Sequence, residues 1–364
     1  MKIIGYLSVI ICFIFLIFNY LNIYLNVKLK RKRCMIIFLT LLLSIIVIAF
    51  MTKPYEGDDL TRYFMHIQNF RDQGINYYYT FPYKDNLLIT ILFYVISLTP
   101  YNNLISIISV ITFYSVIFLL LHKFYKDCSS RYLSLFIVAF TSFVYINHII
   151  SGIRSPMAFA IFALILLYDN ENRNISYSLL YIIPLMIHSS TIVFIGLILL
   201  MKIKKLSNIN IEKWIFIIPY LCLLIAFVFP KNIPIVSDVF NRLLIYANPS
   251  YYVQFLDIRV QIIHLIMFGI ILFLYKQNKD FRNSNKIYNH FYKLLIFLEI
   301  GLLPFPMIFG RFFTLLFVLS IPMFLFIEKL ENKPRRFIII LILILSLGLF
   351  AYRMVNAYYY WRFY

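Results

Sequence analysis

Charged residues are scarce in this 364-residue sequence, and acidic ones are the scarcest: Asp and Glu number 15 against 34 Lys and Arg, and charged residues make up 13% of the chain. Soluble domains are usually about 25% charged and about 45–50% apolar. Here 62% of the residues are apolar. This balance excludes a soluble globular enzyme. The positive charge is also divided into short clusters between apolar runs, so we do not expect nucleic acid as a partner.

Motifs for cofactors and metals are missing as well. The sequence has no Walker loop, no Gly-x-Gly-x-x-Gly, no His-Glu-x-x-His and no Gly-x-Ser-x-Gly. The four cysteines are scattered and form no Cys-x-x-Cys or Cys/His ligand spacing. We therefore expect no cofactor and no metal site.

Apolar runs recur from end to end. A bilayer crossing needs roughly 20 apolar residues, so the composition predicts an all-α, polytopic integral membrane protein with about 10–12 transmembrane helices. We expect one membrane domain over residues 1–364. The candidate spans are 3–27, 35–51, 87–99, 104–121, 132–150, 154–168, 176–201, 213–229, 260–275, 292–309, 312–327 and 337–355.

Topology follows from the positive-inside rule. Dense Lys and Arg clusters lie in the segments 28–33, 202–205, 276–286 and 329–336, which we expect to face the cytoplasm. The longer loops at about 52–86 and 230–258 then face outward. Both are aromatic and carry acidic residues, a composition that suits either sugar rings or an interfacial aromatic belt.

One basic segment does not fit simple counting. Sequential crossings place Lys123, Lys126 and Arg131 outside. If 87–121 is a single broken or re-entrant element, this segment moves inside and residues 151–156 move outside. The later loops then stay inside only if 176–201 is a hairpin, broken near Pro184 and His188. Broken helices are tolerated where they line a cavity.

Arg154 is the most conspicuous charge in an apolar environment. It follows a break at Gly152 and precedes Pro156, which suits the first turn of a helix. A charge at membrane depth costs at least a few kcal/mol, so it is paired, solvated or functional. An Arg beside the N–H groups of a helix start makes an anion site. The alternative is an Arg that extends to the interface.

His188 lies in the middle of a 26-residue apolar run, followed by Ser189, Ser190 and Thr191. A His near its ordinary pKa can accept or donate a proton, and the hydroxyls suit a cap or a sugar. The alternative is a neutral His that bonds a facing helix.

Two further arginines lie near apolar breaks. Arg311 follows Gly310, and Arg259 borders the second outer loop. Several Arg residues with few acids to neutralise them suggest a polyanionic substrate such as a pyrophosphate, although lipid headgroups are anionic too.

An acidic cluster follows the second apolar run. Asp58 and Asp59 precede Arg62 and Tyr63, so Arg62 lies one helical turn after Asp58. Such a cluster can supply an acid/base pair or a cation site. It can equally be the usual acidic preference of a helix start.

Taken in order, these motifs resemble the EpsG family, a branch of the Wzy-type polysaccharide (O-antigen) polymerases. The resemblance rests on Gly57-Asp58-Asp59-Leu-Thr-Arg62-Tyr63, on Gly152-Ile-Arg154 with Ala158 and Ala160, and on Ile187-His188-Ser189-Ser190. It covers most of residues 50–330 and is strongest at about 57–200.

The resemblance implies a membrane glycosyltransferase, similar to the all-helical GT-C type. Such a polymerase joins oligosaccharide repeat units carried on undecaprenyl pyrophosphate, at the outer face of the bacterial cytoplasmic membrane. The product is an O-antigen, capsule or exopolysaccharide. Its partners are the lipid-linked oligosaccharide and membrane lipids, with a chain-length regulator and a flippase as candidate proteins.

Roles for residues follow from the same resemblance. The catalytic candidates are His188, Asp58 and Asp59, and the substrate-binding candidates are Arg62, Tyr63, Arg154, Arg259 and Arg311. Arg154 would be the main pyrophosphate ligand. Two other classes remain open: a flippase or transporter of the lipid-linked sugar, although no internal repeat is visible, and a membrane O-acyltransferase with His188 as its base.

Overall fold

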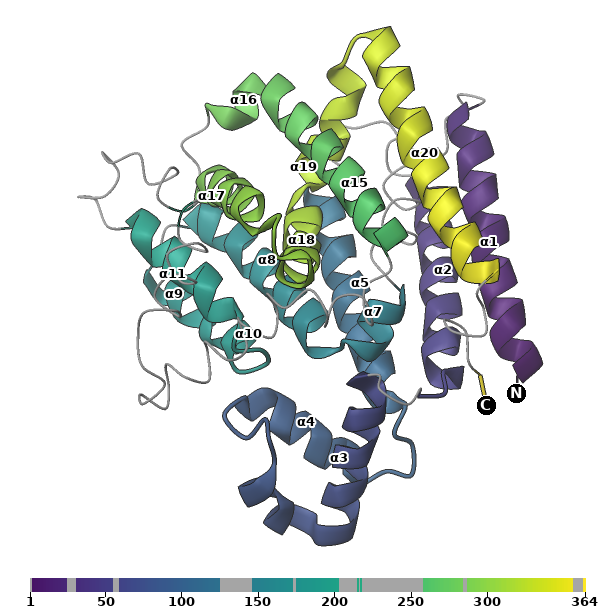
Figure 1. Cartoon of the computed structure of the whole chain (residues 1–364), viewed down its shortest axis with the longest axis vertical. Helices are drawn as coiled ribbons and strands as arrows, with labels where there is room; N and C mark the ends of the chain where they lie inside the picture. The colour runs from purple at the N-terminus through teal and green to yellow at the C-terminus, as the bar shows by residue number, and fades with distance from the viewer. Residues whose placement is uncertain are drawn as a thin grey trace. The chain divides into compact units, whose positions relative to one another are not determined.

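The computed structural model describes residues 2–24, 31–54, 59–124, 146–172, 175–202, 215, 217, 258–283, 287–355 and 363–364 (Figure 1). Regular structure in these ranges is helical, apart from one isolated β-bridge between Thr52 and Phe363. The predicted all-α class is thus confirmed for this part of the chain. Of the expected elements, the spans 132–150 and 213–229 and the outer loop 230–258 lie almost wholly outside the described residues.

The chain divides into two compact units, which we describe separately. Unit 1 comprises Met1–Ile192 and Ile321–Tyr364. Its helices are α1 (Lys2–Tyr24), α2 (Arg31–Met51), α3 (Asp59–Gln73), η1 (Gly74–Thr80), α4 (Leu87–Ser97), α5 (Leu104–Phe124), α7 (Ile146–Ser151), α8 (Arg154–Asn172), α9 (Ile175–Leu180), α10 (Ile182–Leu185), α19 (Ile321–Phe326), η4 (Ile327–Lys329) and α20 (Asn332–Val355). Unit 2, Val193–Ser320, holds α15 (Ile258–Gln277), α16 (Lys279–Arg282), α17 (Ile287–Leu302) and α18 (Pro306–Leu319). The helix α11 (Thr191–Lys202) begins at the boundary.

Apolar helices account for most of the described chain. Among the described residues, α5 alone is both long and apolar enough to cross a membrane by the usual length and composition test. Shorter apolar stretches lie at Ile3–Phe15, Met35–Met51, Leu87–Ser97, Thr191–Met201, Gln261–Gln277 and Ile308–Leu319. The number of crossings stays a prediction.

Helices α2 and α5 run antiparallel. The Asn103 side-chain amide, just before α5, donates hydrogen bonds to the carbonyl oxygens of Phe50 and Thr52 at the end of α2. Further along, the rings of Phe38 and Phe118 lie 5.5 Å apart. The end of α5 therefore lies beside the basic start of α2.

Helix α8 runs parallel to α5. Ser106, near the start of α5, donates to the carbonyl oxygen of Ile150 at 2.9 Å, just before α8 begins. Near the other end, the Lys123 ammonium lies 4.8 Å from the ring centroid of Tyr168. Arg154 at the start of α8 therefore lies at the same end of unit 1 as Thr52, and Lys123 lies at the end where α2 begins.

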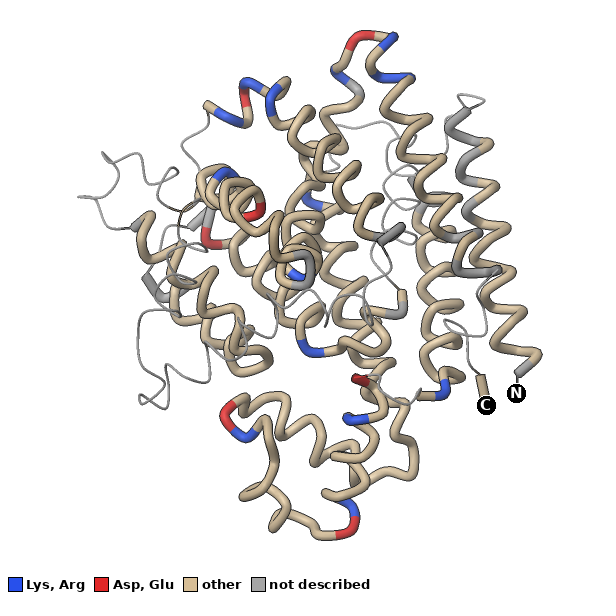
Figure 2. Tube along the Cα trace, in the orientation of Figure 1, with Lys and Arg blue, Asp and Glu red and all other residues tan. Residues whose placement is uncertain are grey.

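Lys123 and the start of α2 therefore lie at one end of unit 1, as the alternative topology requires. Helix α4 has 11 residues, so it measures about 16 Å, far short of a hydrocarbon core of about 30 Å. The predicted span 87–99 thus corresponds to a helix shorter than a full crossing, and its topology stays a prediction. Figure 2 shows further Lys and Arg at the turn that leads into α20.

Helices α3 and α4 form a hairpin at the Thr52 end of unit 1, which we call the α3–α4 hairpin (residues 59–99). Leu60, Tyr63, Ile67 and Phe70 are buried along one face of α3 because their spacing follows the helical repeat. Most of the predicted outer loop 52–86 is thus helical.

Arg71 fastens this hairpin to the start of α5. Its guanidinium donates to the carbonyl oxygens of Ser97 at 3.2 Å and Thr99 at 2.6 Å, and to the Asn102 side chain at 2.7 Å. The acceptors extend from Ser97, the last residue of α4, to Asn102, just before α5, so a single side chain holds three points of this connection.

Replacing Arg71 by Ala should loosen the α3–α4 hairpin. We expect the local stability of the hairpin to fall by about 1.5–3 kcal/mol, because hydrogen bonds from a charged donor are lost and the carbonyl groups must then bind water. Limited proteolysis of the purified protein measures this change, and we expect the variant to be cleaved faster within 59–102. Lys84→Ala is the control because Lys84 is exposed on the same hairpin. Equal cleavage of both variants would contradict the prediction.

Candidate functional site

A strained turn between α7 and α8 positions Arg154. The Gly152 N–H donates to the His148 carbonyl oxygen at 2.8 Å, and Ile153 adopts a φ of 23°, a region that β-branched residues rarely enter. A Cβ on Gly152 would lie 2.6 Å from that carbonyl oxygen. The turn therefore requires glycine at 152, and it aims the next helix start, with Arg154 as its first residue, at the α3–α4 hairpin.

The Arg154 guanidinium is held by two tyrosines. Its Nε–H donates to the Tyr63 hydroxyl at 3.2 Å, and its central carbon lies 3.7 Å from the ring centroid of Tyr83 and 5.8 Å from that of Tyr63. Among the described residues, no hydrogen-bond acceptor binds Nη1 or Nη2. The fork of four terminal N–H groups is thus oriented but available to an anion.

A second arginine, Arg62, precedes Tyr63 on α3. Arg62 forms an ion pair with Asp59, which occupies the first turn of α3. The Arg62 side chain is 60% exposed, so this pair is solvent-screened and weak. Asp58 lies outside the described residues.

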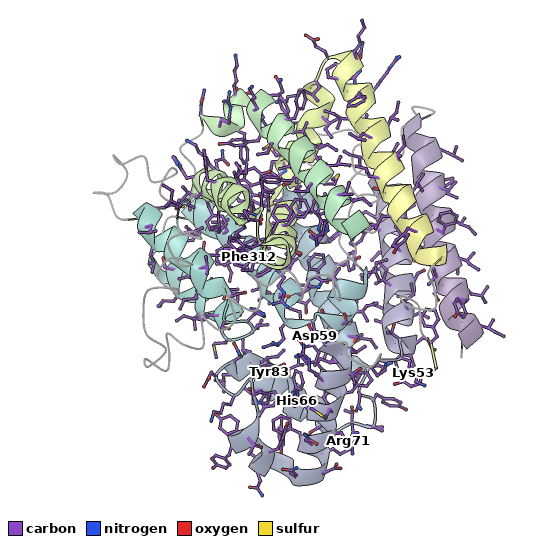
Figure 3. The ribbon with its side chains drawn as sticks, in the orientation of Figure 1. Lys53, Asp59, His66, Arg71, Tyr83 and Phe312 are labelled. Carbon is purple, nitrogen blue, oxygen red and sulfur yellow. The ribbon has the colours of Figure 1, made fainter. Side chains whose placement is uncertain are left out.

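His66 lies one turn after Arg62 and Tyr63, in an aromatic cage. Its Nδ1 shares a hydrogen bond of 2.7 Å with the Tyr77 hydroxyl, and its ring lies 5.3 Å from Phe81 and 5.5 Å from Tyr83. Burial, and then the positive charges of Arg62 and Arg154, lower the pKa of His66 to about 4. His66 is therefore neutral at pH 7. Figure 3 labels it with Tyr83 and Asp59 in this part of unit 1.

His188 lies in a break of the predicted 176–201 run, between α10 and α11. Its Nδ1 accepts the Ser190 backbone N–H at 3.1 Å and lies 2.6 Å from the Ser190 hydroxyl. Because a backbone N–H can only donate, Nδ1 is the acceptor and a neutral ring carries its proton on Nε2. In this tautomer, the ring of His188 donates hydrogen bonds through Nε2.

The start of α4 connects this turn to Arg154. The Met186 carbonyl oxygen accepts from the N–H groups of Leu88 at 3.1 Å and Ile89 at 3.4 Å. Thr90, the next residue, donates to the carbonyl oxygen of Tyr83 at 3.0 Å, and the Arg154 guanidinium lies over the Tyr83 ring. The chain around His188 and the aromatic support of Arg154 are therefore anchored on the same helix end.

Within unit 1, the structure connects several of the predicted site residues. Arg154 contacts Tyr63, Arg62 pairs with Asp59, and both arginines lie close enough to His66 to influence its pKa. Arg259 and Arg311 belong to unit 2: Arg259 is in the first turn of α15, its side chain outside what is described, and Arg311 is half-buried on α18.

Two members of the cluster were not predicted as site residues. Tyr83 stood in the sequence only as one aromatic residue of an outer loop, and His66 carried no signal by itself. The helical spacing of His66 from Arg62 and Tyr63 was the available indication, because residues three and four apart share a helix face. Within the described ranges, no group of three His, Cys, Asp or Glu is arranged to hold a metal ion.

The described part of the chain thus combines apolar helices with a cationic and aromatic cluster. The chain belongs to the EpsG family, whose model matches residues 75–364. Membership implies involvement in exopolysaccharide biosynthesis. No curated protein matches the chain, and no solved structure matches it either.

The matched range differs from the extent that the sequence motifs suggested. It contains Tyr83, Arg154 and His188 but begins after Asp59 and Tyr63. Asp59, Arg62 and Tyr63 therefore enter the site through their contacts in the structure and not through the family match.

Proposed function

We propose that this protein is a polysaccharide polymerase that joins oligosaccharide repeat units carried on undecaprenyl pyrophosphate. The observation that supports it best is the open guanidinium fork of Arg154, fixed by Tyr63 and Tyr83. Planar Arg forks bind phosphate oxygens in pairs. A second cation, Arg62, lies nearby, since the charges of Arg62 and Arg154 both lower the pKa of His66.

The chemistry needs little beyond charge stabilisation and positioning. The bond between the anomeric carbon of the growing chain and its pyrophosphate oxygen breaks, and the electron pair stays on the pyrophosphate. A hydroxyl of the next lipid-linked unit forms the new glycosidic bond and loses its proton. Arg154 and Arg62 would neutralise the charge that develops on the leaving group, which is where preorganised donors have their largest effect.

His188 would orient a substrate oxygen through its Nε2–H. With Nδ1 engaged by Ser190, it is better arranged to donate than to abstract a proton in this conformation. Asp59 would hold Arg62 until an anion competes for it, and Asp58 remains the candidate base beside it. Arg259 and Arg311 stay candidates for contacts with the polyanionic substrate.

The membrane arrangement follows from the two ends of unit 1. Its Arg154 end, which lies beside the α3–α4 hairpin, would face outward, and its Lys123 end would face the cytoplasm. Counting on from α8 then requires 176–201 to turn back at the break around His188. The result is a multi-pass protein of the bacterial cytoplasmic membrane, with about 10–12 crossings and a GT-C-like outer site.

A polysaccharide ladder tests the proposed function. A strain that lacks the gene should lose long chains while a single repeat unit still reaches its acceptor, and the wild-type gene should restore them. Loss of even the single unit would favour a flippase instead. A normal ladder that lacks only acyl groups would favour an acyltransferase.

Removing the aromatic support should weaken substrate binding more than folding. We expect Tyr83→Leu to lower chain extension about fivefold to thirtyfold, since a desolvated cation–π contact is worth about 1–2 kcal/mol. Tyr83→Phe keeps the ring and is the matched control. Chain extension by membranes at equal protein levels measures both, and equal losses would show that the ring face is not what matters.

A further inference from the structure

His66 is a buried titratable residue that the proposed mechanism leaves unused. It lies on the same helix as Arg62 and shares the Tyr83 ring with Arg154: that ring lies 5.5 Å from the His66 ring and 3.7 Å from the Arg154 guanidinium carbon. His66 is only 6% exposed, although it is surrounded by cations and aromatics.

We propose that His66 is a third cationic group of the anion site, taking up a proton when a pyrophosphate group binds to Arg154 and Arg62. This inference rests on the proposed function, because it requires that anion. It assigns His66 a role in ligand binding that depends on pH.

The hydrogen bonds of His66 fit both protonation states. Nδ1 is engaged by the Tyr77 hydroxyl, and a phenol can donate to a bare nitrogen or accept from a protonated one. In the imidazolium form, Nδ1–H donates to the Tyr77 oxygen, and Nε2–H is then the donor for an oxyanion. Tyr77 thus keeps the ring in one orientation while the proton is gained.

Electrostatics supply the coupling. The groups that face His66 are Arg62 and Tyr63 on its own helix, Tyr77 on η1, Tyr83 before α4 and Arg154 on α8. Asp59, the first residue of the same helix, is paired with Arg62. When no anion is bound, burial and then the charges of the two arginines keep the imidazole neutral, with its pKa lowered to about 4. A bound pyrophosphate brings at least two negative charges, which offset the charges of the two arginines and favour the protonated ring.

Proton uptake on binding tests the inference. Inorganic pyrophosphate is titrated calorimetrically into the full-length protein in detergent at pH 6, in MES and in Bis-Tris, whose ionisation enthalpies differ. The wild type should take up more protons per bound pyrophosphate than His66→Gln, by up to about one. The protons that pyrophosphate itself gains cancel in this difference. The affinity of the wild type should also rise more steeply as the pH falls, by at most about tenfold per pH unit relative to His66→Gln.

Controls separate this inference from the proposed function. His290→Gln, an exposed His on α17, should behave as the wild type. Tyr77→Phe keeps the ring but removes the hydroxyl, so it should also reduce the uptake, and it carries the test if His66→Gln does not fold. Equal proton uptake in the wild type and the folded variants would overturn the role of His66 and leave the anion site intact. A wild type that binds no pyrophosphate would overturn the site and this inference with it.

Discussion

Arg154→Ala is expected to lower the rate of chain extension about 100- to 1000-fold, the usual loss when one charge-stabilising donor is removed. The reason is geometric as well as electrostatic. Arg154 presents a fork that Tyr63 and Tyr83 hold in place, so its removal takes away both the charge and the paired donors. The measurement is the length distribution of polysaccharide in a deletion strain that carries the variant at matched membrane levels.

Two variants sharpen this result. Arg154→Lys keeps a positive charge but loses the fork and the Nε–H bond to Tyr63, so it should restore only a small part of the activity. Arg282→Ala removes an exposed arginine from α16 and should leave the ladder unchanged. Chains of normal length from Arg154→Ala would remove the central ligand from the proposal.

Gly152→Ala should be nearly as damaging, although it removes no polar side chain. The new methyl would lie 2.6 Å from the His148 carbonyl oxygen and 2.7 Å from His148 Nδ1, and backbone cannot yield as a side chain does. We expect overpacking to lower the free energy of unfolding by about 1–3 kcal/mol. A displacement of Arg154 by about 1 Å should lower activity about 100-fold.

Gly196→Ala is the matched control, because no atom of the described residues outside its own helix backbone lies within 4 Å of a Cβ there. In a helix interior this change should be neutral or stabilising by up to about 1 kcal/mol. Thermal unfolding in detergent and the polysaccharide ladder compare the pair. His148→Ala combined with Gly152→Ala should rescue only in part, since the carbonyl oxygen remains. Full activity of Gly152→Ala alone would show that the turn does not set the position of Arg154.

Apolar length predicted the long helices well and the short ones poorly. The runs at 35–51 and 104–121 correspond to α2 and α5. The run at 87–99 has the same composition as a short span, yet it packs against α3 in the hairpin, because hydropathy reports burial without saying whether lipid or protein covers the surface. The break at His188 was expected from Pro184, and the structure ends α10 at Leu185.

The site was predictable where a residue was unusual for its surroundings. Arg154 was conspicuous because a charge in an apolar run is costly. Tyr83 was not, because the sequence has 30 tyrosines and stacking depends on a contact between residues 71 positions apart. The contact between Arg154 and Tyr63 joins residues 91 positions apart. It likewise depends on the turn at Gly152 and on the hydrogen bonds by which Arg71 holds the hairpin. Neither follows from local pattern.

The most direct measurement is turnover by the purified protein alone, in detergent or vesicles, with undecaprenyl-pyrophosphate-linked repeat units as the only substrate. The account predicts products of two and more repeats with release of undecaprenyl pyrophosphate, in the wild type and not in Arg154→Ala. Intact repeat units and no released lipid pyrophosphate, from a protein shown to be folded, would contradict it.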